Sequence, residues 1–340
     1  MDTREALSVV AAGRTLTRGE AESAMGSVMA GEATDAQLAA LLAALAVRGE
    51  TVDEIAGFAA GMRAAAVPVA LADGAIDTCG TGGDRSHSFN ISTVAAIVAA
   101  AAGVRVAKHG NRAASSACGS ADVLEALGVK IDLGPESVAT CVHDVGVGFM
   151  FAPRFHPAMR HAAPVRREIG IRTIFNVLGP LANPAGVKRQ LLGVPSAALG
   201  ERMVQVLREL GAERALVVHS ADGLDEISPS GPTRTWELGA DGVIRDGELS
   251  PEDVGLERSP RDSVRGGDSA TNAMIARAVL SGSARDGART AVLLNAGAAY
   301  YIAGLAPDVR GGVAFAAKAI DSGAAMTTLE RWVARSGTLS

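Results

Sequence analysis

The run AIDTCGTGGDRSHSFNISTVAAIVAAAAG, residues 75–103, decides the architecture of this chain. A short β-like segment, 75–79, leads into a glycine-rich turn, 80–84, and an alanine-rich helical segment opens at Asn90. A strand, a glycine-rich turn and a helix start in this order can bind an anion, because backbone N–H groups point outward and glycines let a ligand approach closely. It matches neither a Walker A loop nor the dinucleotide GxGxxG motif. The run therefore predicts a phosphate or pyrophosphate site, and a glycine turn without a ligand is the alternative.

A second polar loop follows the next β-like segment, VRVAK, residues 104–108. Lys108 and Arg112 offer positive charge, and Ser115, Ser116 and Ser120 offer hydroxyl groups before the helical segment SADVLEALG, 120–128. Loops that follow successive parallel strands meet at the carboxyl edge of the sheet, where ligands usually bind. One such loop is often only solvated, but two together favour a binding site.

Outward from these loops, β-like and helical segments alternate, which predicts a mainly parallel sheet covered by helices. The further β-like segments are VKIDL (129–133), VGFMFA (147–152) and RALVVHS (214–220). In the last third we expect helices over 272–280 and 290–303 and a final helix that ends near Trp332. Residues 236–256 are acidic and rich in turn formers.

The first sixty-odd residues contain helical patterns only. Three capping boxes start these helices, because a threonine hydroxyl accepts from free N–H groups while a Glu or Gln reaches back. Gly31 and Gly49 stand where the first two of them should stop. We therefore predict an α/β protein with a small all-helical N-terminal domain, residues 1–70 joined by part of 165–190, and a larger α/β domain, residues 74–340. The three boxes are Thr17 with Glu20, Thr34 with Gln37, and Thr51 with Glu54.

Composition excludes several classes of protein. The 340 residues are 48% hydrophobic and carry a net charge of −5, so no basic surplus is present to neutralise nucleic-acid phosphates. Three cysteines without a CxxC pair argue against a disulfide framework and a structural zinc site. The sequence shows no signal peptide and no apolar run long enough for a membrane span. We expect a cytoplasmic protein with neither a nucleic-acid nor a membrane partner.

Several long strings together resemble one family. GTGGD…SFNIST, VAKHGNRAASS (106–116) and GSADVLEALGV (119–129) closely resemble the anthranilate phosphoribosyltransferases, and the resemblance continues through 151–185, 217–228 and 292–304. It implies transfer of a phosphoribosyl group from phosphoribosyl pyrophosphate (PRPP) to the amine of anthranilate, with magnesium, in tryptophan biosynthesis by a homodimer. It also implies the fold shared by nucleoside phosphorylases and such transferases.

The resemblance also implies the site residues. Anthranilate would contact Gly80, Asn111 and Arg166, and magnesium would be served by Ser92, Asp225 and Glu226. No catalytic residue is expected, because positioning and electrostatics can carry this displacement. The PRPP residues would be Gly80, Gly83, Asp84, Ser88, Asn90, Ile91, Ser92, Thr93, Lys108, His109, Gly110, Asn111, Arg112, Ser115, Ser116 and Ser120.

The residues alone leave alternatives at several of these positions. The Asp225-Glu226 pair can be a magnesium site, since hard oxygens suit Mg²⁺, or a solvated acidic turn. A planar guanidinium fits the anthranilate carboxylate, and Arg172 competes with Arg166 for that contact. Arg85 and His87 depart from the family pattern after GTGGD, where small residues are usual. Ser88 likewise replaces a common Thr, Cys118 replaces a common Ser, and Asn90 or Ser92 could cap the helix.

The residues leave two other functions as alternatives. A pyrimidine nucleoside phosphorylase of the same fold would use phosphate, but the KHGNR string and the spacing from GTGGD to NIST argue against it. A non-catalytic nucleic-acid-binding relative conflicts with the acidic net charge and with the intact Asp225-Glu226 pair. The cysteines are expected to be small packed side chains, and His87, His143 and His219 to be structural or exposed. His156 and His161 belong to a cationic segment that could be solvated, and a neutral His161 could instead pack in the core.

Overall fold

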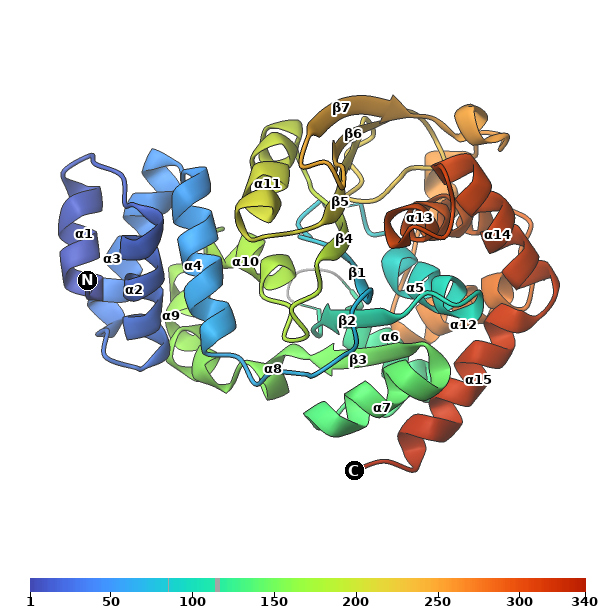
Figure 1. Cartoon of the computed structure of the whole chain (residues 1–340), viewed down its shortest axis with the longest axis horizontal. Helices are drawn as coiled ribbons and strands as arrows, with labels where there is room; N and C mark the ends of the chain where they lie inside the picture. Colours follow the sequence, from blue (N-terminus) through green and yellow to red (C-terminus); the bar gives the residue numbers. More distant parts are fainter. Residues whose placement is uncertain (85, 114–116) are drawn as a thin grey trace.

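The computed structural model, which describes residues 1–84, 86–113 and 117–340, is built on one seven-stranded sheet (Figure 1). The strand order is β3-β2-β1-β4-β5-β6-β7. The first five strands in this order are parallel, whereas β6 and β7 are antiparallel to their neighbours. The strands are β1 (Ile76–Gly80), β2 (Val106–Gly110), β3 (Val147–Phe151), β4 (Arg189–Gly193), β5 (Arg214–Ser220), β6 (Thr233–Leu238) and β7 (Ile244–Leu249).

Helices from residues 91–145 and from the carboxyl-terminal part of the chain cover one face of this sheet (Figure 1). The central helix is α5, which is apolar on nearly every side and packs against α13 and α15. A helix that is hydrophobic all round belongs in a core, so α5 fixes the position of the loop before it. The helices on this side are α5 (Ile91–Ala101), α6 (Ser120–Leu127), α7 (Pro135–Val145), α12 (Ser269–Leu280), α13 (Gly287–Ala303), α14 (Val309–Asp321) and α15 (Ala324–Gly337).

The helical bundle lies beyond the other face, and α10 and α11 stand between the bundle and the sheet (Figure 1). All three predicted capping boxes are formed, at the starts of α2, α3 and α4. A second hydrophobic core joins the bundle to α9, α10, α11 and the sheet. The elements are α1 (Thr3–Ala11), α2 (Arg18–Met29), α3 (Asp35–Arg48), α4 (Val52–Ala64), α8 (Ala152–Phe155), η1 (Pro157–His161), α9 (Ala163–Ile169), α10 (Phe175–Leu181) and α11 (Ala197–Glu209).

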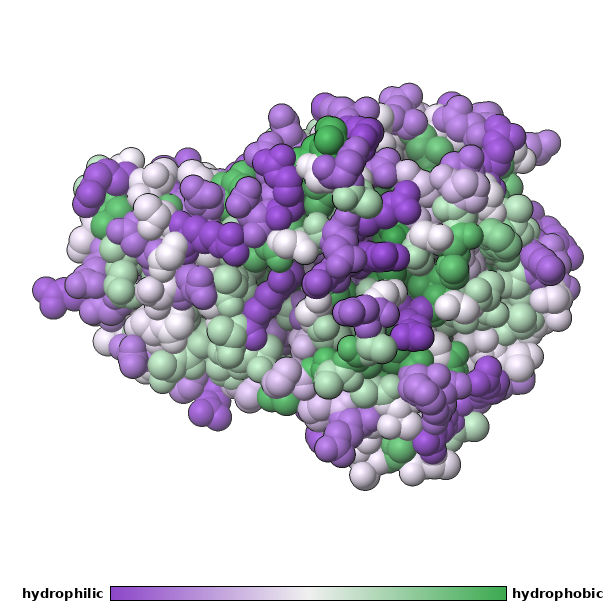
Figure 2. Space-filling model, in the orientation of Figure 1, coloured by the Kyte–Doolittle hydropathy of each residue, from purple (hydrophilic) through white to green (hydrophobic). Residues whose placement is uncertain are grey.

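The molecule has two lobes, a smaller one formed by the helical bundle and a larger one formed by the sheet and its helices. The surface is indented where the two lobes meet (Figure 2). Polar and apolar residues are interspersed over the visible face of both lobes. Among the described residues, no helix is long and apolar enough to cross a bilayer. The α/β class, the helical N-terminal part and the mainly parallel sheet are all as predicted.

Three details differ from the prediction. Residues 129–133 do not form a strand, although their burial alternates as in one: Val129, Ile131 and Leu133 fill the core, but the backbone pairs with no strand of the described chain. Residues 236–256 contain the end of β6 and all of β7, which form an antiparallel hairpin, rather than turns alone. The last helix, α15, continues to Gly337, and two short 3₁₀ helices, η2 (Pro251–Val254) and η3 (Arg261–Val264), precede α12.

Two glycines of α4, Gly57 and Gly61, let this helix pack closely against α2. A Cβ on Gly57 would lie 2.2 Å from the Arg18 carbonyl oxygen, and one on Gly61 would lie 2.7 Å from the Glu22 carbonyl oxygen. Gly57→Ala should therefore force α2 and α4 apart and lower the free energy of unfolding by about 1–3 kcal/mol. Denaturant titration measures this loss, and Gly26→Ala on the open side of α2, where nothing lies within 4 Å of the added Cβ, is the control. Equal midpoints for the two variants would contradict the packing argument.

Candidate active site

Three loops meet at the carboxyl edge of the parallel strands. They follow β1 at Gly80, β2 at Gly110 and β5 at Ser220. Strands β1 and β2 pair at Ile76 and Val106, and the buried Lys108 ammonium group donates to the Thr78 carbonyl oxygen across the two strands. Both predicted anion loops therefore do lie at one edge, and the acidic loop after β5 joins them.

The first loop folds around Asp225. Gly82 N–H donates to Asp225 Oδ2 at 2.8 Å, and a Cβ on Gly80 would lie 2.3 Å from the same oxygen. Gly82 and Gly83 have φ of +69° and +84°, which a side chain rarely tolerates. The loop then bonds to a distant segment, because His87 C=O accepts from Gly266 N–H at 2.8 Å and Ser88 bridges to Arg265. Arg85 lies outside the described residues.

The helix that follows begins at Ile91 with its free N–H groups near the acidic loop. Ser92 N–H donates to Glu226 Oε1 at 3.1 Å. Asn90 is the N-cap residue of this helix, but, contrary to one expectation, its side chain makes no capping hydrogen bond because it is used elsewhere. Its Nδ2 donates to the Cys118 carbonyl oxygen at 3.1 Å, and its Oδ1 accepts from Asn272 Nδ2 at 3.0 Å. Asn90 thus ties the first loop to the second.

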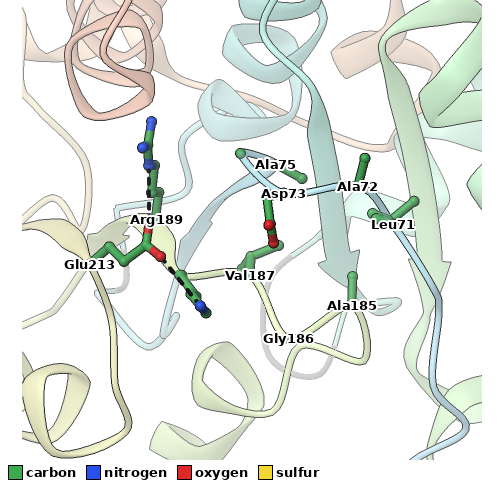
Figure 3. Close-up of a pocket in the computed structure, with 11 residues that line it drawn as sticks. Leu71, Ala72, Asp73, Ala75, Ala185, Gly186, Val187, Arg189 and Glu213 are labelled. Carbon is green, nitrogen blue, oxygen red and sulfur yellow. Dashed lines mark ion pairs between the residues drawn. The ribbon is translucent and has the colours of Figure 1, made fainter.

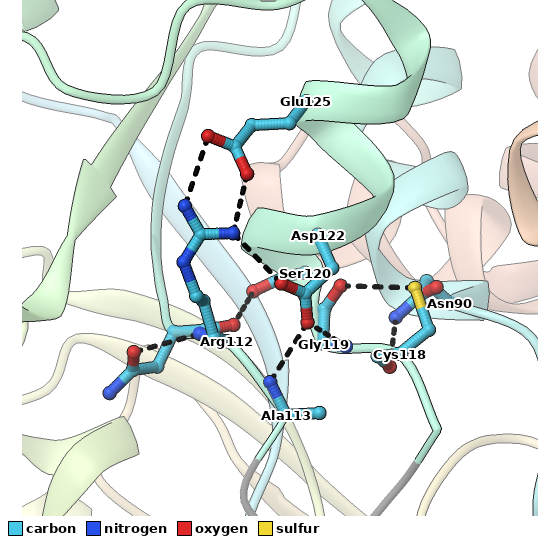
Figure 4. A network of polar contacts seen from close by, with 9 residues as sticks. Asn90, Arg112, Ala113, Cys118, Gly119, Ser120, Asp122 and Glu125 are labelled. Carbon is cyan, nitrogen blue, oxygen red and sulfur yellow. Dashed lines mark hydrogen bonds and ion pairs between the residues drawn. The ribbon is translucent and has the colours of Figure 1, made fainter. Parts of the chain in front are cut away.

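The second loop ends against the first turn of α6 (Figure 4). Ser120 Oγ donates to the Asn111 carbonyl oxygen at 3.2 Å. The Arg112 guanidinium pairs with Asp122 at 3.0 Å and also with Glu125, and these contacts raise its pKa. In this structure Arg112 therefore faces α6. Ser115 and Ser116, which the sequence places in this loop, lie outside the described residues.

The acidic loop buries its two carboxylates together. Asp225 is 8% exposed and Glu226 is 7% exposed. Burial, followed by the charges of Asp84 and Glu226, raises the pKa of Asp225 well above its usual range. Burial also raises the pKa of Glu226 to about 7, although Lys108 opposes this shift. The two carboxylates are therefore not those of a solvated acidic turn, which was the alternative to the predicted magnesium site.

This concentration of negative charge fits a divalent cation. Buried carboxylates that repel one another gain from a bound metal, and Mg²⁺ is usually held by one or two carboxylates plus substrate phosphates. No three His, Cys, Asp or Glu side chains converge as ligands of one ion in the described part of the chain. Asp225, Glu226 and the Ser92 hydroxyl can therefore hold part of the coordination sphere, which leaves positions for ligand oxygens.

Two arginines near the first loop have different surroundings. The half-buried Arg166 guanidinium lies 5.0 Å from the centre of the Phe175 ring, and burial lowers its pKa. No carboxylate of the described residues is within ion-pair distance of it. Arg172 is exposed, and both of its terminal nitrogens lie 3.4 Å from the Gly82 carbonyl oxygen. Arg166 therefore carries an uncompensated charge, while Arg172 rests on the first loop.

Sequence reasoning missed two buried pairs beneath the loops. The sequence groups His156 with cations that could be solvated, but it is buried with its ring 5.0 Å from that of His109. Burial lowers the pKa of these rings to about 4 and about 3, so both are neutral at pH 7. Each Nε2 atom is buried without a hydrogen-bond partner among the described residues. The second pair is Asp77 and Asn183, whose Nδ2 donates to Asp77 Oδ2 at 2.8 Å.

The cysteines are packed side chains, as expected. All three are buried, and no disulfide joins any two of them. Burial raises the pKa of Cys118 and Cys141 to about 11 and that of Cys79 well above its usual value. Thiolate chemistry is therefore disfavoured at neutral pH.

A small cavity of about 60 Å³ lies at the opposite, amino-terminal edge of the sheet (Figure 3). Three of its charged groups pair with one another, because Glu213 contacts Lys188 Nζ at 3.3 Å and Arg189 Nε at 3.7 Å. This cavity is separate from the loops and has about the size of a few water molecules.

The bundle, the parallel sheet and the phosphate-type loops define a glycosyl transferase of two parts. Residues 4–66 match the helical-bundle domain of a glycosyl transferase family, and residues 72–326 match its α/β domain. The anthranilate phosphoribosyltransferase of Chloroflexus aggregans is 57% identical over 334 residues, which are 98% of each chain. The chain belongs to the anthranilate phosphoribosyltransferase family.

Solved structures agree with this assignment. The crystal structure of the enzyme from Thermus thermophilus has a TM-score of 0.92 and 46% identity, and the match covers 99% of both chains. The Saccharomyces cerevisiae enzyme, in complex with PRPP and Mg, has a TM-score of 0.90 and 28% identity over 98% of both chains. The resemblance read from the sequence strings is thus confirmed.

Proposed function

We infer that this chain transfers the phosphoribosyl group of PRPP to the amine of anthranilate. The products are pyrophosphate and N-(5-phosphoribosyl)anthranilate, as required in tryptophan biosynthesis. The observation that carries this conclusion is the meeting of a glycine loop, a helix start and two buried carboxylates at one sheet edge, in a chain that matches this family along its whole length.

The reaction is a displacement at the anomeric carbon of the ribose. The anthranilate nitrogen forms a bond to this carbon while the bond to the pyrophosphate oxygen breaks, so positive charge develops on the ribose ring and negative charge on the leaving group. When bound, Mg²⁺ supplies charge neutralisation for the pyrophosphate. The N–H groups of the first loop stabilise the same charge. The aryl amine is neutral at physiological pH, so this chain needs no strong base and acts by positioning both substrates.

We assign PRPP to the two loops after β1 and β2. Support comes from their convergence, from the open space beside Gly82 and from the buried Lys108, which brings a positive charge beneath the loops. Asp225, Glu226 and Ser92 are assigned to Mg²⁺. The loop residues assigned to PRPP are Gly80, Gly83, Asp84, Ser88, Asn90 to Thr93, Lys108 to Arg112, Ser115, Ser116 and Ser120.

We assign anthranilate to Gly80, Asn111 and Arg166. The support is the free charge of Arg166, which a substrate carboxylate would neutralise, and the exposed side of Asn111 next to the second loop. Arg172 is assigned to the first loop instead, because its nitrogens lie against Gly82.

We also propose a domain organisation, a localisation and an oligomeric state for this protein. Two domains, residues 1–70 with part of 165–190 and residues 74–340, are supported by the separate matches of 4–66 and 72–326 to two domain families. A cytoplasmic homodimer is proposed, and the 89% exposed Val47 on α3 is one apolar side chain that a second copy would cover. Light scattering on the purified chain tests the dimer.

The loss of anthranilate fluorescence tests the function directly. The signal should fall when PRPP and Mg²⁺ are both present and should stay constant when either is omitted. Replacing PRPP with inorganic phosphate and a pyrimidine nucleoside tests the phosphorylase alternative. Consumption of the nucleoside in place of anthranilate would contradict the proposed function.

Gly82→Val should raise the KM for PRPP by about tenfold or more with a small change in circular dichroism. A Cβ at this position meets no atom within 4 Å, so the fold has room for it, but it occupies the space beside the loop backbone and strains φ at +69°. Steady-state kinetics with PRPP as the varied substrate measures the effect. Gly74→Val is the matched control, because it has a positive φ of +91° and open space but lies before β1. A normal KM for PRPP in Gly82→Val would remove this loop from the site.

A further inference from the structure

One carboxylate holds both ends of the second loop (Figure 4). Asp122, in the first turn of α6, accepts from Ala113 N–H at 3.0 Å and from Gly119 N–H at 2.8 Å with the same oxygen, Oδ2. Its other oxygen, Oδ1, accepts from Arg112 Nη1 at 3.0 Å. Three donors from the loop thus converge on one side chain, which has no contact of its own with the acidic loop after β5 among the bonds described.

The two ends of the loop are also in direct contact. A Cβ on Gly119 would lie 2.4 Å from Ala113 N and 2.7 Å from the Asn111 carbonyl oxygen, so only glycine lets the ends meet this closely. Ser120 Oγ and Ala121 N–H both donate to that carbonyl oxygen at 3.2 Å. The loop is therefore closed at its base, and Asp122 bridges the closure.

The charge of Asp122 is maintained by these contacts. Burial opposes ionisation, but the Ala113 and Gly119 N–H groups, followed by Arg112, lower its pKa overall. Two N–H groups and a guanidinium favour the charged form of this carboxylate, because hydrogen bonds to a charged acceptor are stronger than those between neutral groups. Glu125 contacts only the guanidinium side of this network.

We propose that Asp122 is a positioning residue for PRPP binding: it holds the two described ends of the second loop together and so fixes Arg112 and Ser120, which are assigned to PRPP. This inference rests on the proposed function, which assigns PRPP to this loop. Asp122 acts through the loop and touches neither substrate nor reacting atoms. Neither the family resemblance nor the sequence motifs assigned it a role.

The test compares Asp122→Ala and Asp122→Asn with Asp308→Ala. Asp308 is a matched control, because it caps α14 by accepting from Gly311 N–H at 2.7 Å and belongs to no loop of the site. KM for PRPP, KM for anthranilate, kcat and the melting temperature are measured for all three. Asp122→Ala should raise KM for PRPP at least about tenfold and change KM for anthranilate less than about twofold.

Asp122→Asn should lie between wild type and Asp122→Ala. An amide keeps one acceptor oxygen for the two N–H groups, but it loses the charge and presents N–H groups to Arg112. Asp308→Ala should lower the melting temperature and leave both KM values unchanged. An unchanged KM for PRPP in both Asp122 variants, or an equal rise in both KM values, would overturn the inference. If wild type itself fails to consume anthranilate with PRPP, the proposed function fails instead, so the two failures are distinguishable.

Discussion

The double variant Asp225→Asn, Glu226→Gln should lose activity by about a hundredfold or more. Each change removes a negative charge and keeps the side-chain shape, so the loop geometry should persist while the affinity for Mg²⁺ falls. The leaving pyrophosphate then lacks the neutralising cation, and lost electrostatic stabilisation of this kind costs about 10²–10³ in rate. Anthranilate fluorescence decay over a Mg²⁺ titration measures the loss, and excess Mg²⁺ should restore activity only partly.

The same variant should be at least as stable as wild type without Mg²⁺. The buried Asp225 and Glu226 and the half-buried Asp84 repel one another, and the amides remove most of this repulsion. Adding Mg²⁺ should raise the melting temperature of wild type and leave that of the variant nearly unchanged, since a ligand stabilises only the state that binds it. Asp222→Asn, on the same loop but bonded to Ser228 and Ser230, is the control. Wild-type activity of the double variant at low Mg²⁺ would contradict the metal assignment.

Local signals in the sequence predicted much of the fold. The capping boxes at Thr17, Thr34 and Thr51 involve neighbours three residues away, so their outcome depends little on the rest of the chain. Residues 129–133 show the limit of such patterns. Their alternating burial is that of a strand, but a strand also needs a partner, and Lys130 N–H donates instead to Ser336 Oγ, about 200 residues away.

In the candidate site, too, local patterns predicted some features, whereas contacts between distant segments decided others. The order of strand, glycine turn and helix predicted the first loop, and the topology of parallel strands predicted that the second would lie beside it. Burial of Asp225 and Glu226 was not visible, because a bare Asp-Glu pair is usually solvated and only the packing of the acidic loop against Gly80 and Gly193 encloses it. The contact between His109 and His156 joins segments far apart in the sequence, so no spacing rule could have found it.

Arg166→Ala should raise the KM for anthranilate about ten- to a hundredfold and change the KM for PRPP far less. A charged hydrogen-bonded contact to a carboxylate is worth about 1.5–3 kcal/mol, which corresponds to that range of affinity. Arg166 is suited to this contact because its guanidinium lies against the Phe175 ring and has no carboxylate partner within the described chain. Steady-state kinetics with each substrate varied in turn measures both constants.

Arg166→Lys and Arg172→Ala complete the experiment. Lysine keeps the charge but lacks the planar fork and its stacking on Phe175, so it should recover only part of the anthranilate affinity. Arg172→Ala should mainly affect the KM for PRPP, because the Arg172 nitrogens lie against the Gly82 carbonyl oxygen of the first loop. If Arg172→Ala abolishes saturation by anthranilate while Arg166→Ala leaves it intact, the carboxylate contact belongs to Arg172, and the free charge of Arg166 serves the packing between α9 and α10 alone.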